Sequence, residues 1–295
     1  MLQQGHTKLL LGVFVDDLII AANDMNLYNR FAKDLKARFQ LSSEGSISNF
    51  LGVSICQDLT SGTIKVDQAA YIESTLQRFG FSNSNDSGVS TPMVPNQRIS
   101  KHDSPEINNP EHTAHFRAVV GSLLYLANWT RPDICFAVGE LSKVLANPGP
   151  VHLRAAHRLL RYLKRTSNLG ITYSAHRNSA AELNQLWGYC DADWGGDPDS
   201  FKSTGGYVCF LNGGAISWKS KRQQTIALSS AEAEFMAASR MAQEVVYLRH
   251  LLSQFGYVQE LPTVVYEDNK AAISMSENAG LRERTRHINL LVHFV

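Results

Sequence analysis

Cysteine is scarce in this sequence, so neither a disulfide framework nor a cysteine-based metal site is expected. Four cysteines occur in 295 residues, and none is spaced from another as metal ligands are. Each lies in an apolar stretch, which predicts buried, reduced thiols and an intracellular protein. The four positions are Cys56, Cys135, Cys190 and Cys209.

Long hydrophobic runs and a strong charge of one sign are also missing. The longest apolar stretch, residues 9–22, is interrupted by Asp16 and Asp17 and is too short to span a bilayer. The first residues do not resemble a secretory signal, so no membrane contact is expected. The formal net charge is only +1, so any surface that binds nucleic acid must be local. An apolar fraction of 44% predicts folded domains rather than disorder.

Three carboxylates lie where predicted strands end or a predicted helix begins. Apolar and aromatic residues lead from Leu186 into Asp191, and a pair of glycines then ends the strand. Asp268 ends the strand-like run 263–268, and Glu234 lies at the start of an apolar-striped helix. A carboxylate at the end of a strand is a common metal ligand. Taken alone, the stretch from Leu186 to Asp191 favours a strand that runs into an acidic turn. The three acids taken together favour a metal site.

Local geometry distinguishes each predicted ligand from an acidic neighbour. Ser229 followed by Glu232 fits a capping box, which gives Glu232 a structural role. Glu234 shares its helix face with apolar residues that must pack on the sheet, so its carboxylate needs a cation or a hydrogen-bond donor. Glu267 and Asp268 point to opposite faces of a strand, so only one of them can enter a shared pocket. The helix start that follows favours Asp268.

Clustered carboxylates repel one another unless a cation neutralises them. Ligands that are all oxygen atoms favour Mg²⁺ or Mn²⁺. Two such ions activate a water molecule and stabilise the leaving oxygen during phosphodiester hydrolysis. The pattern therefore predicts a divalent-metal nuclease. Basic residues between the first two acids can hold a nucleic-acid backbone, and these are Lys202, Lys219, Lys221 and Arg222.

The first 82 residues alternate between predicted hairpins and helices. Two apolar runs meet at Asp16 and Asp17, which predicts a β-hairpin with the aspartates at its tip. They serve there either as turn residues or as a pair of metal-binding carboxylates. The following elements are an amphipathic helix at 28–39, a hairpin at 50–66, a helix at 68–79 and a polar, proline-containing linker at 83–112.

Residues 113–180 form a predicted helical connection region. The helical pattern breaks near Pro132 and again at 147–150. On the last helix the arginines occupy one face and the leucines and alanines the other. Such faces are usually just solvated, but arginines without an acidic partner in the segment also favour contact with phosphate. The four are Arg154, Arg158, Arg161 and Arg165.

Residues 181–295 have the pattern of an α/β domain. Three strands, a long helix, a fourth strand and another helix follow one another, which predicts a mixed sheet with helices packed on it. Taken with the hairpins and helices upstream, the expected class of the whole chain is α/β (α+β).

Five motifs of this last region resemble the ribonuclease H domain of copia-type LTR retrotransposon Pol polyproteins. They are Gly-Tyr-Cys-Asp-Ala-Asp-Trp at 188–194, Lys-Ser-Thr-Gly-Gly-Tyr at 202–207, Ala-Ile-Ser-Trp-Lys-Ser-Lys at 215–221, Leu-Ser-Ser-Ala-Glu-Ala-Glu at 228–234 and Glu-Asp-Asn-Lys-Ala-Ala-Ile at 267–273. Upstream, Phe-Val-Asp-Asp-Leu at 14–18 resembles the catalytic palm motif of the reverse transcriptase of these elements. Further motifs between 50 and 134 resemble its thumb and connection.

The resemblance implies a partial reverse-transcriptase palm and thumb (1–82), the linker and connection region, and an RNase H-like domain (181–295). It implies that two Mg²⁺ or Mn²⁺ ions are held by Asp191, Glu234 and Asp268 and that the RNA strand of an RNA–DNA hybrid is cut. Expected partners are the hybrid and the remainder of the Pol polyprotein, in a cytoplasmic particle or the nucleus. Asp16 and Asp17 match two of the three polymerase aspartates.

The sequence departs from the family at two positions of consequence. The third polymerase aspartate and the fingers are expected to lie upstream of this chain, so polymerase activity is not expected. His-Ile-Asn at 287–289 stands where the family has His-Ile-Asp, which makes Asn289 a degenerate fourth ligand. A catalytically dead remnant that only binds nucleic acid is the alternative, and a DEDD-type exonuclease fits the segment order less well.

Overall fold

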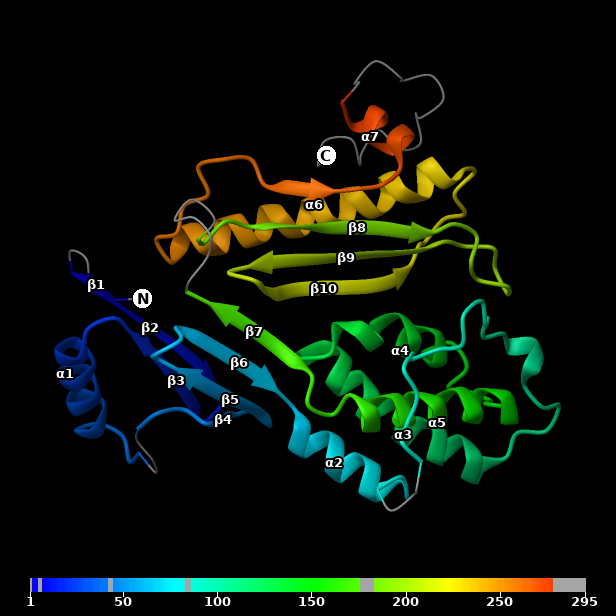
Figure 1. Ribbon diagram of the computed structural model, residues 1–295, viewed down its shortest axis with the longest axis horizontal. Coiled ribbons are helices and arrows are strands. Elements are labelled where there is room, and N and C mark those ends of the chain that lie inside the picture. Colours follow the sequence, from blue (N-terminus) through cyan, green and yellow to red (C-terminus); the bar gives the residue numbers. More distant parts are fainter. Residues whose placement is uncertain (1, 5–6, 42–44, 83–85, 176–182, 278–295) are drawn as a thin grey trace.

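The structure is a computed structural model that describes residues 2–4, 7–41, 45–82, 86–175 and 183–277. Within them, three separate sheets and seven α-helices form a mixed α/β molecule of the α+β type (Figure 1). No helix among these residues is both long and apolar enough to cross a membrane.

The first sheet is antiparallel and consists of β1 (Leu2–Gln4), β2 (Thr7–Phe14) and β3 (Asp17–Ala22). The hairpin predicted around the two aspartates is confirmed, because β2 and β3 pair from Leu9↔Ala22 to Phe14↔Asp17. Its tight turn forces Val15 to a φ of 52°, a left-handed conformation that a β-branched residue rarely adopts. Helix α1 (Met25–Lys36) follows, starting and ending three residues before the predicted bounds.

The second sheet joins segments that are far apart in the sequence. Strands β4 (Asn49–Phe50), β5 (Val53–Asp58) and β6 (Thr63–Asp67) form the predicted second hairpin. The fourth strand, β7 (Gly170–Ser174), pairs with β6 although it follows the helical region. Cys56 on β5 is exposed, so its predicted burial is wrong: its strand partner is Lys65, on a face that meets solvent.

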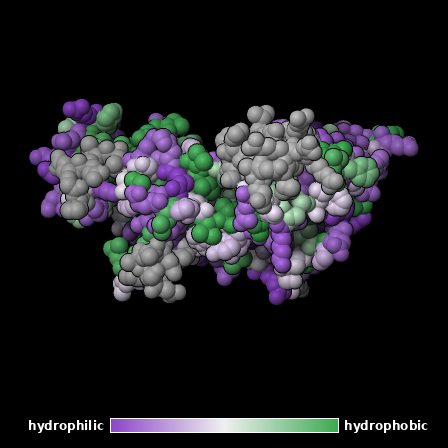
Figure 2. Space-filling model, turned by 90° about the horizontal axis from the view of Figure 1, so that it is seen from above, coloured by the Kyte–Doolittle hydropathy of each residue, from purple (hydrophilic) through white to green (hydrophobic). Residues whose placement is uncertain are grey.

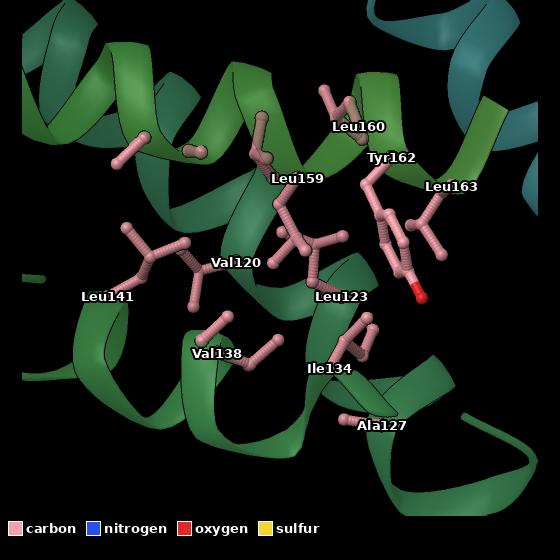
Figure 3. Close-up of a cluster of buried hydrophobic side chains, with 14 of the residues drawn as sticks. Val120, Leu123, Ala127, Ile134, Val138, Leu141, Leu159, Leu160, Tyr162 and Leu163 are labelled. Carbon is pink, nitrogen blue, oxygen red and sulfur yellow. The ribbon is translucent and has the colours of Figure 1, made fainter. Parts of the chain in front are cut away.

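A helical unit lies between β6 and β7 in the sequence. Its elements are α2 (Ala69–Arg78), η1 (Lys101–Asp103), α3 (Pro110–Trp129), η2 (Pro132–Ile134), α4 (Cys135–Ser142) and α5 (Pro150–Arg165). The helix breaks fall at the predicted prolines, where a missing N–H and a fixed φ end a helix or start a new one. Leucine and valine side chains of α3, α4 and α5, together with Ile134 of η2, point at one another in Figure 3 and are buried.

The third sheet has the order β10-β9-β8-β11. Strands β8 (Trp187–Asp193), β9 (Thr204–Leu211) and β10 (Gly214–Arg222) are antiparallel, and β11 (Val264–Tyr266) is parallel to β8. The long helix α6 (Ser230–Gln254) packs across β8 and β9, and α7 (Lys270–Glu277) lies beyond β11 (Figure 1). Alternate residues of β8, among them Cys190, enter the core with Met241 and Val245 of α6.

The domain boundaries stay predictions, and two features cross them. Strand β7, from the predicted connection region, completes the sheet of the first region. The predicted linker also packs closely: Ile99 is fully buried, and Ser100 donates a hydrogen bond to Asp199 at 2.6 Å. Hydrophobic residues reach the surface in several places, among them near the middle of the face seen in Figure 2.

Candidate metal centre

Asp191 lies near the end of β8. Gly188 on the same strand determines how closely helix α6 approaches β8. A Cβ atom on Gly188 would overlap the carbonyl oxygen of Val208 and lie 2.6 Å from Cε of Met241. Only glycine therefore allows α6 and β9 to approach β8 this closely. The close approach brings the start of α6, which carries Glu234, beside the end of the strand that carries Asp191.

Helix α6 begins as the sequence predicts, and its first turn separates the two glutamates. The Ser229 hydroxyl accepts a hydrogen bond from the Glu232 backbone N–H at 3.2 Å, and the Glu232 carboxylate accepts one from the Leu228 N–H at 2.8 Å. Glu232 is thus used in capping. Glu234 is 6% exposed, and its Oε2 is buried without a hydrogen-bond partner.

Asp268 reaches the same place because β11 runs parallel to β8. The pairs run from Val264↔Trp187 to Tyr266↔Tyr189, so the chain leaves β11 toward the end of β8 that carries Asp191, and Asp268 follows two residues later. Helix α7 starts directly afterwards, and Asn269 caps it by accepting hydrogen bonds from the N–H groups of Ala271 and Ala272. This capped turn holds Asp268 at the end of the strand.

The structure brings the three predicted acids together. One carboxylate oxygen from each of Asp191, Glu234 and Asp268 lies within 4.8 Å of the other two. Among the described residues, these acids form the one group of three or more histidine, cysteine, aspartate and glutamate residues that is close enough to hold a metal ion. Their role as ligands stays a prediction.

The electrostatics of the group are those of a site that needs a cation. Burial raises the pKa of Glu234 to about 8, and the nearby charges of Glu267, Asp191 and Asp268 raise it further in the same direction. Without a cation, Glu234 therefore holds a proton at neutral pH. The donor set is all oxygen and includes an orphaned buried atom, which fits a hard divalent cation such as Mg²⁺ or Mn²⁺.

Glu267 is a site neighbour that the sequence analysis set aside. Its Oε2 accepts a hydrogen bond from the Cys190 thiol at 3.3 Å, and its Oε1 accepts one from the Asn269 N–H at 3.0 Å. Its negative charge contributes to the raised pKa of Glu234. Glu267 lies just after the end of β11, so strand alternation does not apply to it in the structure, and the metal-binding group contains Asp268 instead.

Asp193 lies on β8 two residues after Asp191, but it is ion-paired with an arginine instead of joining the acidic group. The Arg98 guanidinium forms a bidentate ion pair with the Asp193 carboxylate, and this pair raises the pKa of Arg98. Because 95 residues separate the two, no local pattern predicts the contact. Asp197 lies in the loop that follows β8 and is fully buried and ion-paired with Lys143 and Arg222.

The other predicted site residues do not join the acidic group. Asp16 lies in the turn between β2 and β3, Asp17 is the first residue of β3, and both are exposed. Asn289 lies outside the described residues, so its predicted role is untested.

The predicted basic residues are partly engaged within the protein. Lys202 donates a hydrogen bond to the carbonyl oxygen of Gln224 at 2.6 Å, and Arg222 pairs with Asp197. Lys219 and Lys221 are exposed on β10. They remain open to a nucleic-acid backbone.

The arginine face of α5 also has internal partners. Arg161 forms an ion pair with Asp86, and Arg158 donates a hydrogen bond to Thr91 at 2.8 Å. The sequence analysis looked for an acid within the helical segment, whereas Asp86 comes from the predicted linker. Arg154 and Arg165 are exposed and are left as the candidates for phosphate contact.

Comparison with known proteins places the chain among retroelement proteins. Residues 1–95 match the family model of reverse transcriptase (RNA-dependent DNA polymerase). The chain is 36% identical to the retrovirus-related Pol polyprotein from transposon TNT 1-94 of Nicotiana tabacum, over 97% of the chain and 21% of that protein. No solved structure is significantly similar.

Two shorter relatives are covered over most of their length. The putative transposon Ty5-1 protein YCL074W of Saccharomyces cerevisiae is 32% identical, over 80% of the chain and 73% of that protein. The secreted RxLR effector protein 161 of Plasmopara viticola is 47% identical, over 45% of the chain and 90% of that protein.

The chain belongs to the copia-type family of retrotransposon Pol polyproteins, as its motifs indicated, and it carries reverse-transcriptase sequence in its first third. It spans about a fifth of the length of the polyproteins that it matches, 21% and 19% for two of them.

Proposed function

We propose that the region around the third sheet is a metal-dependent ribonuclease that cleaves the RNA strand of an RNA–DNA hybrid. The observation that carries this proposal is the convergence of Asp191, Glu234 and Asp268, with a buried Glu234 oxygen that lacks a partner. The mixed sheet with a parallel fourth strand and α6 packed across it supports an RNase H-like domain, which the motifs implied.

The three acids would hold two Mg²⁺ or Mn²⁺ ions, with Asn289 as a fourth, uncharged position. When bound, such ions supply an activated water and stabilise the leaving oxygen of a phosphodiester. Glu234 contributes from a water-poor position, where its charge is fully available to a cation. The exposed Lys219 and Lys221, together with Arg154 and Arg165, are proposed to contact backbone phosphates.

We propose that this chain alone has no polymerase activity. Asp16 and Asp17 match two of three polymerase aspartates, and no third acid among the described residues lies near enough to form a metal-binding group with them. The remainder of a Pol polyprotein is the proposed source of the rest of the polymerase.

Cleavage of an end-labelled RNA in an RNA–DNA hybrid tests the proposed activity. The purified chain is assayed with Mg²⁺, with Mn²⁺ and with EDTA, alongside Asp191→Asn and Asp268→Asn. We expect cuts within the RNA strand that require the metal and disappear in both variants. Single-stranded RNA and duplex DNA serve as controls, and end-directed degradation of single strands would point to an exonuclease instead. Metal-independent binding without any cleavage would favour the alternative, a dead remnant that only binds nucleic acid.

A further inference from the structure

Two histidines that are not part of the acidic group face each other from different helices. His115 on α3 and His157 on α5 are 42 residues apart, yet their Nε2 atoms lie 3.5 Å from each other. Their rings meet edge to face, with centroids 5.8 Å apart. His115 is exposed and His157 is half-buried, so the space between the two nitrogens is open to solvent.

Aromatic residues that follow α2 hold both imidazoles in place. The ring of Phe79 packs edge-on against His115 at 5.6 Å, and that of Phe81 packs against His157 at 5.3 Å. Phe79 and Phe81 in turn pack against the buried core of the helical unit. Because the two side chains are already ordered, a ligand that binds both of them costs little rotamer entropy.

The distance between the nitrogens suits a shared metal ion better than a hydrogen bond. An N–H donor and its acceptor are normally 2.7–3.2 Å apart, so the pair is too far apart for a strong hydrogen bond. A Zn²⁺ ion binds imidazole nitrogen at about 2.0–2.1 Å in tetrahedral geometry, which separates two ligand nitrogens by about 3.3 Å. Very little movement would bring the pair to that separation.

The protonation of the pair also suits a metal. Burial lowers the pKa of His157, and the neighbouring His115 lowers it further, so its imidazole is neutral at neutral pH. Neutral imidazole is the form that binds metal, and it prefers borderline ions such as Zn²⁺ to the hard ions that suit carboxylates. Nearby positive charge is partly neutralised, because Arg161 on the next turn of α5 is paired with Asp86.

We propose that His115 and His157 form a binding site for Zn²⁺ that bridges α3 and α5, separate from the acidic metal centre. Within the part of the chain that the structure describes, no third histidine, cysteine or acid joins them in a metal-binding group. Water therefore completes the coordination shell, and the ion exchanges readily and is removed by chelators. Bound Zn²⁺ ties together two helices of the unit that supports the third sheet.

The test is equilibrium dialysis of the full chain against Zn²⁺, in saturating Mg²⁺ so that the acidic centre is occupied. All proteins carry Cys56→Ser, so that the free, exposed thiol of Cys56 does not compete for Zn²⁺. We expect the parent to bind one more Zn²⁺ ion than His115→Ala or His157→Ala does. If the variants still bind this ion, we expect their affinity for it to be at least tenfold weaker. His250→Ala, which removes an exposed histidine of α6, should behave as the parent does. Equal uptake by the parent and the two site variants would overturn the proposal.

A second measurement needs no site variant and guards against misfolding. Side-chain ¹⁵N NMR of the parent reports which histidine nitrogens change on titration with Zn²⁺. The proposal predicts that the Nε2 signals of two histidines shift together and return with EDTA. Unchanged histidine signals at saturating Zn²⁺ would overturn it.

Discussion

Glu234 combines a buried carboxylate, an oxygen without a partner and three acidic neighbours. A group of this kind destabilises the folded chain unless a proton or a cation is bound to it. Such residues cluster at functional sites, because the cost is compensated by the ligand that they bind. The neighbouring Glu232 is also buried, but its carboxylate has a partner, because it accepts a hydrogen bond from the Leu228 N–H at the start of the helix.

The two glutamates should therefore respond differently to the same change. Glu234→Gln removes a charge that only a cation compensates, and we expect loss of hybrid cleavage by at least a hundredfold. Glu232→Gln is the matched control on the same turn, and we expect near-normal cleavage with a stability loss of about 1 kcal/mol from the weakened cap. Cleavage rates and urea denaturation of both variants measure the difference. Loss of activity in Glu232→Gln alone would contradict the assignment.

The pKa of Glu234 also predicts how the metal-free protein responds to pH. At about 8 it lies above the value of 4.5 for an unperturbed glutamate. Between these values the folded state binds a proton that the unfolded state has lost, so the free energy of unfolding falls as the pH rises. We expect a loss of roughly 1–3 kcal/mol between pH 5 and pH 8.5 in EDTA.

Urea denaturation at a series of pH values measures this loss. Glu234→Gln should flatten the dependence because it cannot titrate, and Mg²⁺ should flatten it because the cation replaces the proton. Parallel curves for the wild type and Glu234→Gln in EDTA would show that another group is responsible.

At the scale of elements, the site depends on how closely α6 lies over β8. Gly188 has no side chain to separate them, and its Cβ position is occupied by the Val208 backbone and the Met241 side chain. The pairing of β11 with β8 is equally decisive, because Asp268 follows β11 by two residues and a shift in the register would move it relative to Asp191.

Gly188→Ala tests the spacing directly. The added methyl group must push β9 or α6 away, and we expect a stability loss of about 1–3 kcal/mol together with weaker Mg²⁺ binding. Gly206→Ala is the control in the same sheet, since its Cβ would meet the Lys219 carbonyl oxygen at an ordinary 3.4 Å. Thermal denaturation and calorimetric Mg²⁺ titration report both effects. Equal stability of the two variants would mean that the sheet and helix adjust without cost.

At the scale of the whole molecule, the helical unit and the third sheet are joined by buried charge. Asp197 is fully buried and accepts hydrogen bonds from Lys143 at 3.0 Å and from Arg222 at 2.7 Å. Burial alone would raise its pKa, but hydrogen bonds from Ser200, Lys143 and Arg222 outweigh it and lower the pKa to about 2. Lys143 comes from the segment after α4, so this contact links the two parts of the chain.

Asp197→Asn should be among the most destabilising single changes. It removes the ion pairs of Asp197 with Lys143 and Arg222, although Lys143 keeps its pair with Glu140, and we expect a loss of about 3 kcal/mol. The wild type should itself lose this stabilisation as the pH falls below about 4 toward 2, because the folded-state pKa lies below the value of 3.8 for a free aspartate. Asp103→Asn, at an exposed position, is the control in denaturant titrations. A loss below 1 kcal/mol would mean that the two parts are held together by other contacts.

A further prediction concerns polymerase activity and follows from the share of the related polyproteins that the chain spans. Since it spans only 21% of a related polyprotein, the parts that place template and nucleotide are expected elsewhere. Primer extension by the purified chain should be undetectable on RNA and DNA templates, despite Asp16 and Asp17. Template-dependent extension that disappears in Asp16→Asn would contradict this.

Local sequence determined the elements of this protein and the identity of its candidate ligands. Periodicity, caps and prolines specify hairpins and helices because those signals act between residues a few positions apart. The same rules placed Asp191, Glu234 and Asp268 at element ends and distinguished Glu234 from Glu232.

Tertiary structure alone decided which distant groups meet. The pairs Arg98 with Asp193, Arg161 with Asp86 and His115 with His157, and the pairing of β7 with β6, each join residues that no local pattern connects. The electrostatic reach of Glu267 also depends on how β11 lies beside β8 and α6. The physical reason is that such contacts arise when whole surfaces pack, and packing depends on the combined shape and burial of many side chains rather than on any short run of them.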